Sequence, residues 1–320
     1  MPSVFVGIDV SKASLDVHAL PAALALRVPN TPDGHRKLLQ AILPLAATPQ
    51  EIRVVLESTG GLEFPAALAL EEAGVQVAII KPERARYFAK GHGQPAKTDA
   101  IDAAILALFA KDVKLTIVPL PSKDLREFRD LLDRRQQLVD MRTMESNRRA
   151  TTLLPAASRS LETHIAWINR EIKTIEGDLD RRIAADPRWA ELDRIIQSVP
   201  GLGGQTARVL IGHLPELGRV SRGTIGHLVG VAPIAADSGK TEGPRHILGG
   251  RRQVRNCLYM AAVTAIRCNP VGAALYKRLT GRGKSSKAAL IAVAHKLLTI
   301  VNAMVAKETV WQHSKVAETP

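Results

Sequence analysis

Short apolar segments typical of β-strands alternate with helical segments over about the first hundred residues. Strands are predicted at residues 3–10, 14–20, 24–28, 52–57 and 75–80, and helices from Thr31 to about residue 46, from Phe64 to Ala73 and from Thr98 to Lys111. Only a short polar turn separates the first two strands, so we expect them to pair. Strands that alternate with helices are typical of an α/β domain.

The chain after this region is predicted to be mainly helical. Pro119 and Pro121 mark a boundary, and two long amphipathic helices rich in Arg and Glu follow at residues 122–152 and 158–184, with Pro155 between them. Their heptads are imperfect, so we expect a helical hairpin or coiled-coil-like spacer. Further helices are expected up to Gln197 and at about residues 250–268, 271–280 and 285–307. The predicted domains are therefore residues 1–121, 122–186 and 187–320.

The basic excess lies in the last quarter of the chain. The net charge is +13, and residues 239–320 hold 14 basic and 3 acidic side chains. These charges are interleaved with apolar helical patterns, which favours a polyanion-binding surface over a solvated lysine tail. Aromatic residues make up only 3% of the chain, which argues against base-stacking platforms such as the RNA-recognition motif.

Composition also excludes several other classes. Two cysteines, Cys257 and Cys268, cannot form a disulfide framework or a four-cysteine zinc site, and we expect both to be buried packing residues. His92 and His246 are expected at the surface. No run of about 18 apolar residues is evident, so no membrane span is expected. The first residues are predicted to form a strand, so no signal peptide is expected and a cytoplasmic location follows.

Four acidic residues have a spacing that suits a two-metal site. Asp9 ends the first predicted strand, Glu57 ends a later buried strand, and Asp99 and Asp102 lie three residues apart on one face of a helix start. Parallel strands would bring the first two together, and the helix could close the site from the side. Hard oxygen ligands suit Mg²⁺, or Mn²⁺ in its place, and paired ions stabilise the attacking and leaving oxygens of phosphoryl transfer.

Each of these acids also has an ordinary structural explanation. Asp99 could cap a helix or interact with its N-terminal dipole. Asp9 in Gly-Ile-Asp is also compatible with the start of an actin-like sugar kinase. Glu57 could be an isolated acid at a strand end. The metal-site hypothesis depends on the order and context of all four.

A glycine-rich connection begins at Val199-Pro-Gly-Leu-Gly, between two predicted helices. It resembles a helix-hairpin-helix, in which Gly201 and Gly203 would let backbone N–H groups approach a phosphate while the next helix contributes its N-terminal dipole. The motif carries no base specificity. The alternative is a plain glycine-rich helix connection.

Ser238 lies in a basic, glycine-rich loop. Gly239 follows it and leaves the hydroxyl accessible, and five cations nearby could bind a phosphodiester and stabilise its transition state: Lys240, Arg245, Arg251, Arg252 and Arg255. A serine hydroxyl is a weak nucleophile unless it is activated. The loop lacks Gly-x-Ser-x-Gly and a P-loop, so the residues alone favour an ordinary loop serine.

Taken together, these motifs resemble the insertion-sequence-110 family of transposases, the bridge-RNA-guided DNA recombinases. The resemblance runs along almost the whole chain and depends on the combination and order of seven segments: Gly7-Ile-Asp-Val-Ser-Lys, Leu56-Glu-Ser-Thr-Gly, Lys97-Thr-Asp-Ala-Ile-Asp-Ala, Val199-Pro-Gly-Leu-Gly, Gly230-Val-Ala-Pro, Asp237-Ser-Gly-Lys and Arg255-Asn-Cys-Leu-Tyr-Met-Ala.

The resemblance implies a fold and a mechanism. The N-terminal domain would be RuvC-like, of the RNase-H type, with Asp9, Glu57, Asp99 and Asp102 as its acidic quartet. A helical spacer and a C-terminal transposase domain would follow. Ser238 would attack DNA and form a phosphoserine link. A bridge RNA would pair with donor and target DNA, and homodimers would assemble into a tetramer.

Three rival functions stay open on the residues. A RuvC-like nuclease or junction resolvase would hydrolyse DNA and need the acids but not Ser238. A nucleic-acid-binding protein with a decayed acidic site would not need Asp9. An actin-like kinase would need a second phosphate loop, which the sequence does not show.

Overall fold

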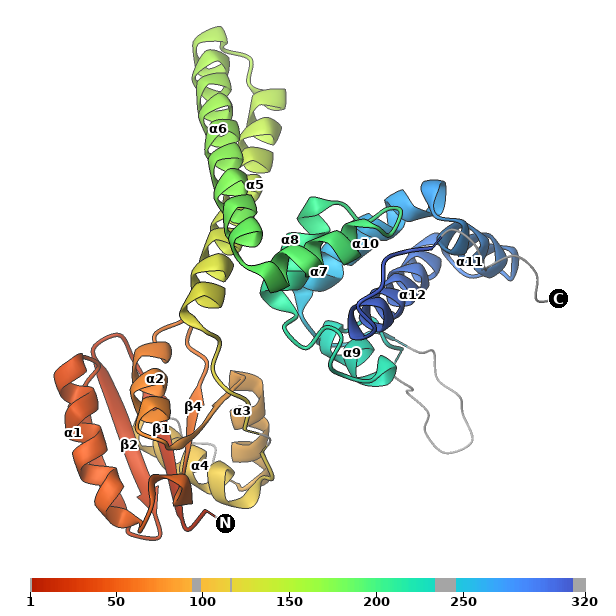
Figure 1. Ribbon diagram of the computed structural model, residues 1–320. Coiled ribbons are helices and arrows are strands. Elements are labelled where there is room, and N and C mark those ends of the chain that lie inside the picture. Colours follow the sequence, from red (N-terminus) through yellow and green to blue (C-terminus); the bar gives the residue numbers. More distant parts are fainter. Residues whose placement is uncertain (1, 94–98, 116, 234–245, 313–320) are drawn as a thin grey trace. The chain divides into compact units, whose positions relative to one another are not determined.

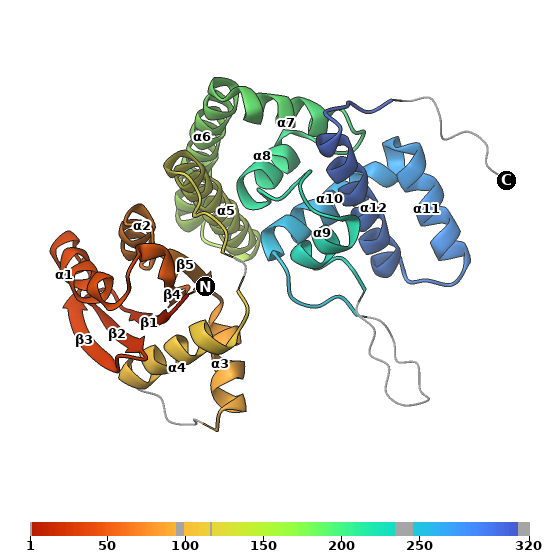
Figure 2. The ribbon, with the colours of Figure 1, turned by 60° about the horizontal axis from the view of Figure 1, so that its bottom comes forward.

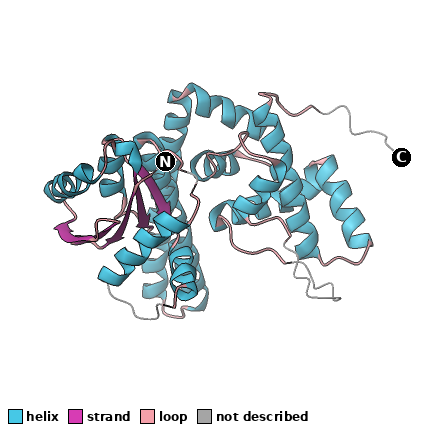
Figure 3. Cartoon of the chain, turned by 90° about the horizontal axis from the view of Figure 1, so that it is seen from below, coloured by secondary structure: helices cyan, strands magenta, loops and turns pink. Residues whose placement is uncertain are grey.

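Every strand of the described chain lies in the first of two units, residues 1–121, and the described part of the second unit, residues 122–320, is helical apart from its loops (Figures 1 and 3). The computed structural model describes residues 2–93, 99–115, 117–233 and 246–312. The expectation of an α/β N-terminal region followed by a mainly helical remainder is confirmed.

A mixed sheet of five strands forms the centre of the first unit. In chain order the strands are β1 (Val4–Val10), β2 (Ser14–Leu20), β3 (Leu24–Pro29), β4 (Ile52–Glu57) and β5 (Gln76–Ile80). Their order across the sheet is β3-β2-β1-β4-β5. β2 is antiparallel to β1 and β3, whereas β4 is parallel to β1 and β5. This arrangement is consistent with an RNase-H-like domain.

Helices cover both faces of the sheet (Figure 2). On one face, α1 (Pro32–Ile42) and α2 (Phe64–Glu72) pack against alternate strand residues such as Ile8 and Val54. On the other face, α3 (Pro82–Gly91) and α4 (Asp99–Asp112) pack against Val55 and its neighbours. Because both faces are buried, β1 and β4 are apolar along almost their whole length.

The local sequence explains where the helices begin. The Thr31 side chain accepts a hydrogen bond from the Gly34 backbone N–H and caps α1. The sequence also predicts that Lys81-Pro82 ends a strand, but it does not predict the helix that begins there. Pro82 is the first residue of α3, where its missing N–H costs no hydrogen bond.

Two long helices, α5 (Lys123–Thr151) and α6 (Pro155–Ala185), open the second unit and pack against each other. Their facing sides bury Leu132 and Leu138 from α5 and Ile168 and Leu179 from α6. Pro155 is the first residue of α6 and not only a break between the helices. Their many charges partly pair, for example Arg135 with Glu176.

Four of the remaining helices pack against α12 (Ser286–Ala306): they are α7 (Pro187–Gln197), α9 (Arg222–Val229), α10 (Arg252–Cys268) and α11 (Pro270–Gly281). The fifth, α8 (Gly204–His213), packs against α5, α7 and α10. By length and composition α12 passes as a candidate membrane span, a test that buried core helices also pass, although Lys287, His295 and Lys296 interrupt its apolar run. Val293, Leu297 and Val301 are fully buried in the core of this unit, which explains the apolar character of the helix.

The two cysteines differ from the sequence-based expectation. Both lie on α10, as predicted, but only Cys257 is partly buried, whereas Cys268 is exposed. Burial is the main cause that raises the pKa of the Cys257 thiol. The prediction that Cys268 is a buried packing residue is therefore wrong. His92 and His246 are exposed, as expected.

Candidate active site

Asp9 and Glu57 occupy adjacent positions at the ends of two paired strands. The parallel β1–β4 ladder pairs Gly7 with Val55 and Ile8 with Leu56, so the next position on each strand holds the acid. Asp9 and Glu57 lie two residues beyond Gly7 and Val55, and side chains two residues apart share a face of the sheet. Both acids are therefore on the face that α4 covers.

α4 approaches this face closely because Gly7 has no side chain. A Cβ on Gly7 would lie 2.0 Å from the Ala103 carbonyl oxygen and 2.3 Å from the Ala107 backbone nitrogen. At the opposite end of the helix, Arg53 Nη1 donates to the Ala110 carbonyl oxygen over 3.4 Å. α4 therefore runs opposite to β1, and its N-terminal turn lies at the end of the sheet that carries Asp9.

This orientation determines where the helix acids lie. Asp99 is the first residue of α4, and Asp102 follows within the first turn, next to Ala103 on the side that contacts the sheet. Asp9, Glu57 and Asp102 are all partly buried. The first turn of α4 thus brings its acids to the same end of the sheet as the two strand acids.

The acids do not form a closed metal-binding set among the described side chains. Within that part of the chain, no three His, Cys, Asp or Glu side chains lie close enough together to hold a metal ion. The side chain of Asp99 is outside the described set. The donors that are present are carboxylate oxygens, which are the ligands that Mg²⁺ and Mn²⁺ prefer.

The sheet register adds an acid that the sequence analysis did not select. Asp16 on β2 is the cross-strand partner of Asp9, on the face that α4 covers. Arg27 on β3 pairs with Asp16, with Nε 3.5 Å from Oδ2, and also donates to the Ser14 hydroxyl. The short turn between β1 and β2 indicates from the sequence that these strands pair. Which residues lie opposite each other depends on tertiary packing, so the sequence did not identify Asp16 as the partner of Asp9.

A buried carboxylate organises the loop that follows Glu57. Glu63 is only 2% exposed. It accepts hydrogen bonds from the Ser58 and Thr59 hydroxyls and from the backbone N–H groups of Thr59 and Gly61, over 2.9–3.3 Å. These bonds fix the path of the chain directly after Glu57.

Asn30 joins this loop to the turn after β1. Its amide Nδ2 donates to the carbonyl oxygens of Ser11 and Leu62, each over 3.1 Å. The Asn30 Oδ1 atom lies 2.9 Å from His35 Nε2. Burial lowers the pKa of His35, which favours the neutral ring beside Asn30. The two loops that leave the acidic strand ends are therefore held together.

Ser238, Lys240 and Arg245 lie outside the described residues. The described residues on both sides of this segment meet. A Cβ on Gly250 would lie 2.3 Å from the Gly230 backbone nitrogen, and the Arg251 N–H donates to the Leu228 carbonyl oxygen over 3.0 Å. The described chain before and after this segment is thus in contact at Gly230 and Gly250, between α9 and α10.

The three described arginines of the predicted basic loop have different environments. Arg251 forms a bidentate pair with Glu216 over 2.5–2.6 Å and donates to the His213 carbonyl oxygen. Arg255 donates to the Gly249 carbonyl oxygen. Arg252 is exposed at the first position of α10. Of the three, Arg252 is the one whose side chain is most available to a phosphate.

Glu216 is ionised in this environment. Burial opposes its charge, but the hydrogen bonds and the charge of Arg251 outweigh burial and lower the pKa of Glu216. Arg251 thus ties the start of α10 to the segment after α8. Sequence reasoning did not identify Glu216 as its partner, because the two residues are 35 positions apart.

Gly201 and Gly203 have different roles in the connection between α7 and α8. Gly201 has a φ of +96°, and a Cβ there would lie 2.7 Å from Ala265 on α10, so glycine is required by packing. Gly203 is the N-cap residue of α8, and nothing lies within 4 Å of a Cβ built on it. The N-terminus of α8 therefore borders a shallow hollow of about 520 Å³ that includes Thr206.

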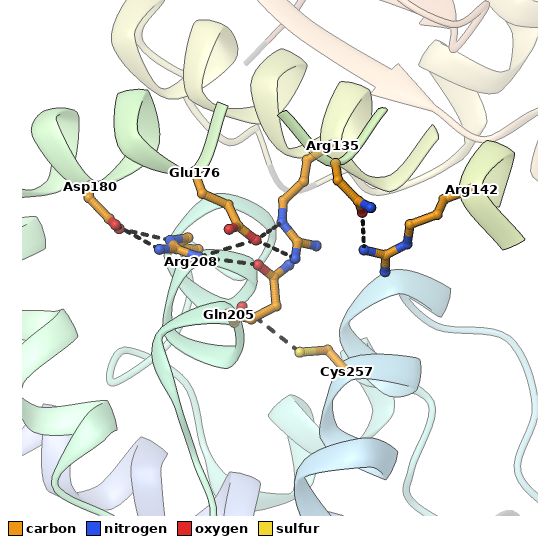
Figure 4. A network of polar contacts seen from close by, with 8 residues as sticks. Arg135, Arg142, Glu176, Asp180, Gln205, Arg208 and Cys257 are labelled. Atoms are coloured by element: carbon orange, nitrogen blue, oxygen red, sulfur yellow. Dashed lines mark hydrogen bonds and ion pairs between the residues drawn. The ribbon is translucent and has the colours of Figure 1, made fainter. Parts of the chain in front are cut away.

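A network of polar contacts links the long helices to α8 (Figure 4). Arg208 on α8 forms two hydrogen bonds with Asp180 on α6, and Arg135 on α5 pairs with Glu176 on α6. Arg208 and Arg135 are mostly buried. The geometry of these arginines is explained by helix packing.

Two family models match the two regions of the chain that carry the candidate residues. Residues 6–156 match a family model described as a transposase, of the DEDD IS110 type, and residues 193–277 match the model of the transposase IS116/IS110/IS902 family. This chain belongs to the IS110 family of transposases. It is a DNA-modifying enzyme of the transposase and recombinase class.

Curated relatives extend the likeness over nearly the whole chain. The insertion element IS110 uncharacterized 43.6 kDa protein of Streptomyces coelicolor is 22% identical and covers 97% of this chain and 95% of its own length. The insertion element IS900 uncharacterized 42 kDa protein of Mycobacterium paratuberculosis is 24% identical, with 96% and 97% covered. The pilin gene-inverting protein of Moraxella bovis is 22% identical, with 95% and 96% covered.

Proposed function

We propose that this transposase cleaves and exchanges DNA strands through a phosphoserine intermediate on Ser238, with a divalent metal at the acidic strand ends. The Ser238 oxygen attacks the phosphorus of a phosphodiester, the bond to the 3′-oxygen breaks, and the 3′-hydroxyl leaves with a proton. The ester retains the energy of the broken bond, so a new 3′-hydroxyl can displace the serine without an external energy source.

The adjacency of Asp9 and Glu57 carries this proposal. Both acids lie on the face covered by α4, at the end that receives Asp99 and Asp102. Their carboxylate oxygens fit Mg²⁺, or Mn²⁺ in its place. When bound, the metal would supply positive charge at the scissile phosphate. The protein's own acids hold that position, and Glu63 fixes the loop after Glu57.

The basic residues around Ser238 would bind the phosphate on which it acts. Arg252 is exposed, and its position at the start of α10 lies next to the exit of the Ser238 segment. We assign Lys240, Arg245, Arg251 and Arg255 to the same surface from the sequence. In the described structure Arg251 binds Glu216, so its contribution would be to position the loop rather than to bind phosphate.

The domain assignment follows from these roles. Residues 1–121 would be the RuvC-like catalytic domain, residues 122–186 the helical spacer, and residues 187–320 the transposase domain with its helix-hairpin-helix. The division of the chain after Pro121, the α5–α6 hairpin and the open α8 N-terminus at Gly203 support this assignment.

The partners would be donor and target DNA together with a bridge RNA that pairs with both. A homodimer assembling into a tetramer would let the acids of one subunit act with the serine of another. A cytoplasmic location suits these partners. The pilin gene-inverting relative supports DNA inversion as a related outcome of the same chemistry.

Trapping a covalent protein–DNA adduct tests the proposal. The wild-type protein, incubated with Mg²⁺, element-end DNA and the RNA transcribed beside the gene, should form an adduct that survives denaturation. Ser238→Ala and Asp9→Asn should abolish it, whereas Ser160→Ala and Asp33→Asn, at exposed positions, should not. An adduct formed by Ser238→Ala would overturn the nucleophile assignment.

The hydrolytic nuclease is the second candidate function, favoured by the position of Asp9 and Glu57 independently of Ser238. It would produce cleaved ends without an adduct. Cleavage that needs Asp9 but persists in Ser238→Ala would identify this alternative.

A further inference from the structure

A hollow in the second unit combines an apolar floor with cations around it. It is formed by α11 and α12 together with the first residue of α9, and its volume is about 570 Å³, within the range of about 300–1,000 Å³ typical of ligand sites. Val271, Leu275 and Leu279 on α11 and Ala292 on α12 line the apolar part. Val271, Leu275 and Leu279 recur every four residues and therefore lie on one face of α11.

Three cations surround this floor. Arg222 belongs to α9, Arg278 to α11 and Lys296 to α12, and all three are exposed. None of them forms an ion pair with a described residue, unlike Arg135, Arg208 and Arg251, whose charges are paired elsewhere in the unit. Three exposed positive charges around one hollow are a site for an anion.

Acidic side chains are almost absent from the described chain that surrounds the hollow. Among the described residues from 217 to 312, Glu308 is the only acidic side chain, and it does not line the hollow. The positive charge therefore remains open to a ligand from outside.

His295 provides separate evidence that the surroundings of the hollow are positively charged. It lines the hollow beside Lys296, and its Nε2 atom is buried without a hydrogen-bond partner in the described structure. Burial lowers the pKa of His295, and the charges of Arg222 and His227 lower it further. The ring is therefore held neutral next to the cations, and the positive charge of the hollow comes from Arg and Lys.

We propose that this hollow binds an unpaired nucleotide of a nucleic-acid strand, with its phosphate between Arg222, Arg278 and Lys296 and its sugar and base against Leu275 and Leu279. Cations hold phosphates, and an apolar floor can contact the face of a base only when the base is not stacked within a duplex. None of the residues that line the hollow is a candidate acid or a candidate cation of the proposed active site.

The proposal deepens the proposed function, because single strands occur in any strand exchange guided by an RNA. The inference rests on the proposed function only for the biological role of the hollow. Binding itself requires no metal, cleavage or serine chemistry, so it can be tested apart from them.

The test compares nucleic-acid affinity of the full-length protein over a series of salt concentrations without divalent metal. The probes are a single-stranded DNA, the same sequence as RNA, and the corresponding DNA duplex. The triple variant Arg222→Gln, Arg278→Gln, Lys296→Gln should lose at least about tenfold in affinity for a single strand. The slope of log affinity against log salt should fall by about 0.7, the contribution of the one phosphate contact that is lost on a single strand.

A matched control removes the same number of positive charges from α11, its C-terminal end and α12. Lys277, Arg282 and Lys287 are exposed and do not line the hollow, and their triple Gln variant should lose several-fold less affinity. A second test blocks the hollow without changing charge. Ala274→Trp should weaken single-strand binding, whereas Ala303→Trp, at an exposed position on α12 outside the hollow, should not.

Equal losses in the two triple variants would overturn the proposal, and so would an Ala274→Trp protein that binds as tightly as wild type. An equal loss on duplex and single strand would contradict the unpaired nucleotide. A loss limited to the RNA or to the DNA probe supports the proposal and identifies the strand. Failure of the proposed function would give a different result. The protein would then neither cleave DNA nor form an adduct, but its binding to a single strand would still depend on the hollow.

Discussion

Asp16 lies directly opposite Asp9 across the antiparallel β1–β2 pair, and both residues are on the face of the sheet that α4 covers. Like charges in cross-strand positions repel. Arg27 reduces this cost by pairing with Asp16. At the acidic end of the sheet, Asp16, whose charge is balanced by Arg27, therefore lies next to the candidate metal ligand Asp9.

Asp16 should tune metal affinity without being essential. Asp16→Asn removes one negative charge near Asp9, so the Mg²⁺ concentration that gives half-maximal cleavage should rise about fivefold, equivalent to about 1 kcal/mol. Arg27→Gln should shift it in the opposite direction. Metal titrations of cleavage measure both, with Asp33→Asn as the exposed control. Identical titrations for all variants would contradict this role.

Glu63 should stabilise the loop after Glu57. Glu63→Ala leaves four hydrogen-bond donors without their buried acceptor and should lower the free energy of unfolding by about 3 kcal/mol. Glu63→Gln retains one oxygen and should cost less. Urea denaturation measures both changes. Glu72→Ala, near the end of α2, serves as the control, and a loss no larger than the control's would disprove the assignment.

Gly7 should be required for the approach of α4. In Gly7→Ala the new Cβ would overlap the Ala103 carbonyl oxygen, so α4 should be displaced, with a loss of at least about 2 kcal/mol in stability. Cleavage should fall further than stability alone explains, because Asp102 would move relative to Asp9.

The matched control for this substitution is Gly177 in α6. Only the far end of Arg181 lies within 4 Å of a Cβ there, at 3.8 Å. Gly177→Ala should therefore stabilise the protein by about 0.5–1 kcal/mol, because alanine favours the helix. Thermal unfolding of the two variants should shift in opposite directions.

The Glu216–Arg251 pair should make stability sensitive to acid. The pKa of Glu216 is lowered in the folded protein from its ordinary value of 4.5, so its contribution is present above pH 4.5 and is lost as pH falls through the lower folded value. Glu216→Gln should reduce stability at neutral pH and flatten its decline below pH 4.5. Denaturation series at several pH values, with Glu308→Gln as control, measure this change.

Local patterns predicted most elements of the first unit. β1, β2 and β4 follow from short apolar runs, and α1 follows from the Thr31 cap, because these signals are contained within a few neighbouring residues. α3 was missed because Pro82 was interpreted only as the end of a strand. Cys268 was misplaced because periodicity on α10 does not show which side meets another helix.

The sequence by itself determined the kinds of elements, the family-like order of acids and the location of the excess positive charge, because each depends on residue type and short-range spacing. Only the tertiary structure decided that Asp9 has Asp16 and Glu57 as its neighbours, that Arg251 binds Glu216, and that Arg222 shares a hollow with Arg278. Apart from the Asp9–Asp16 pair, these relationships join residues far apart in the chain, and strand register and helix packing, which no local pattern contains, bring all of them together.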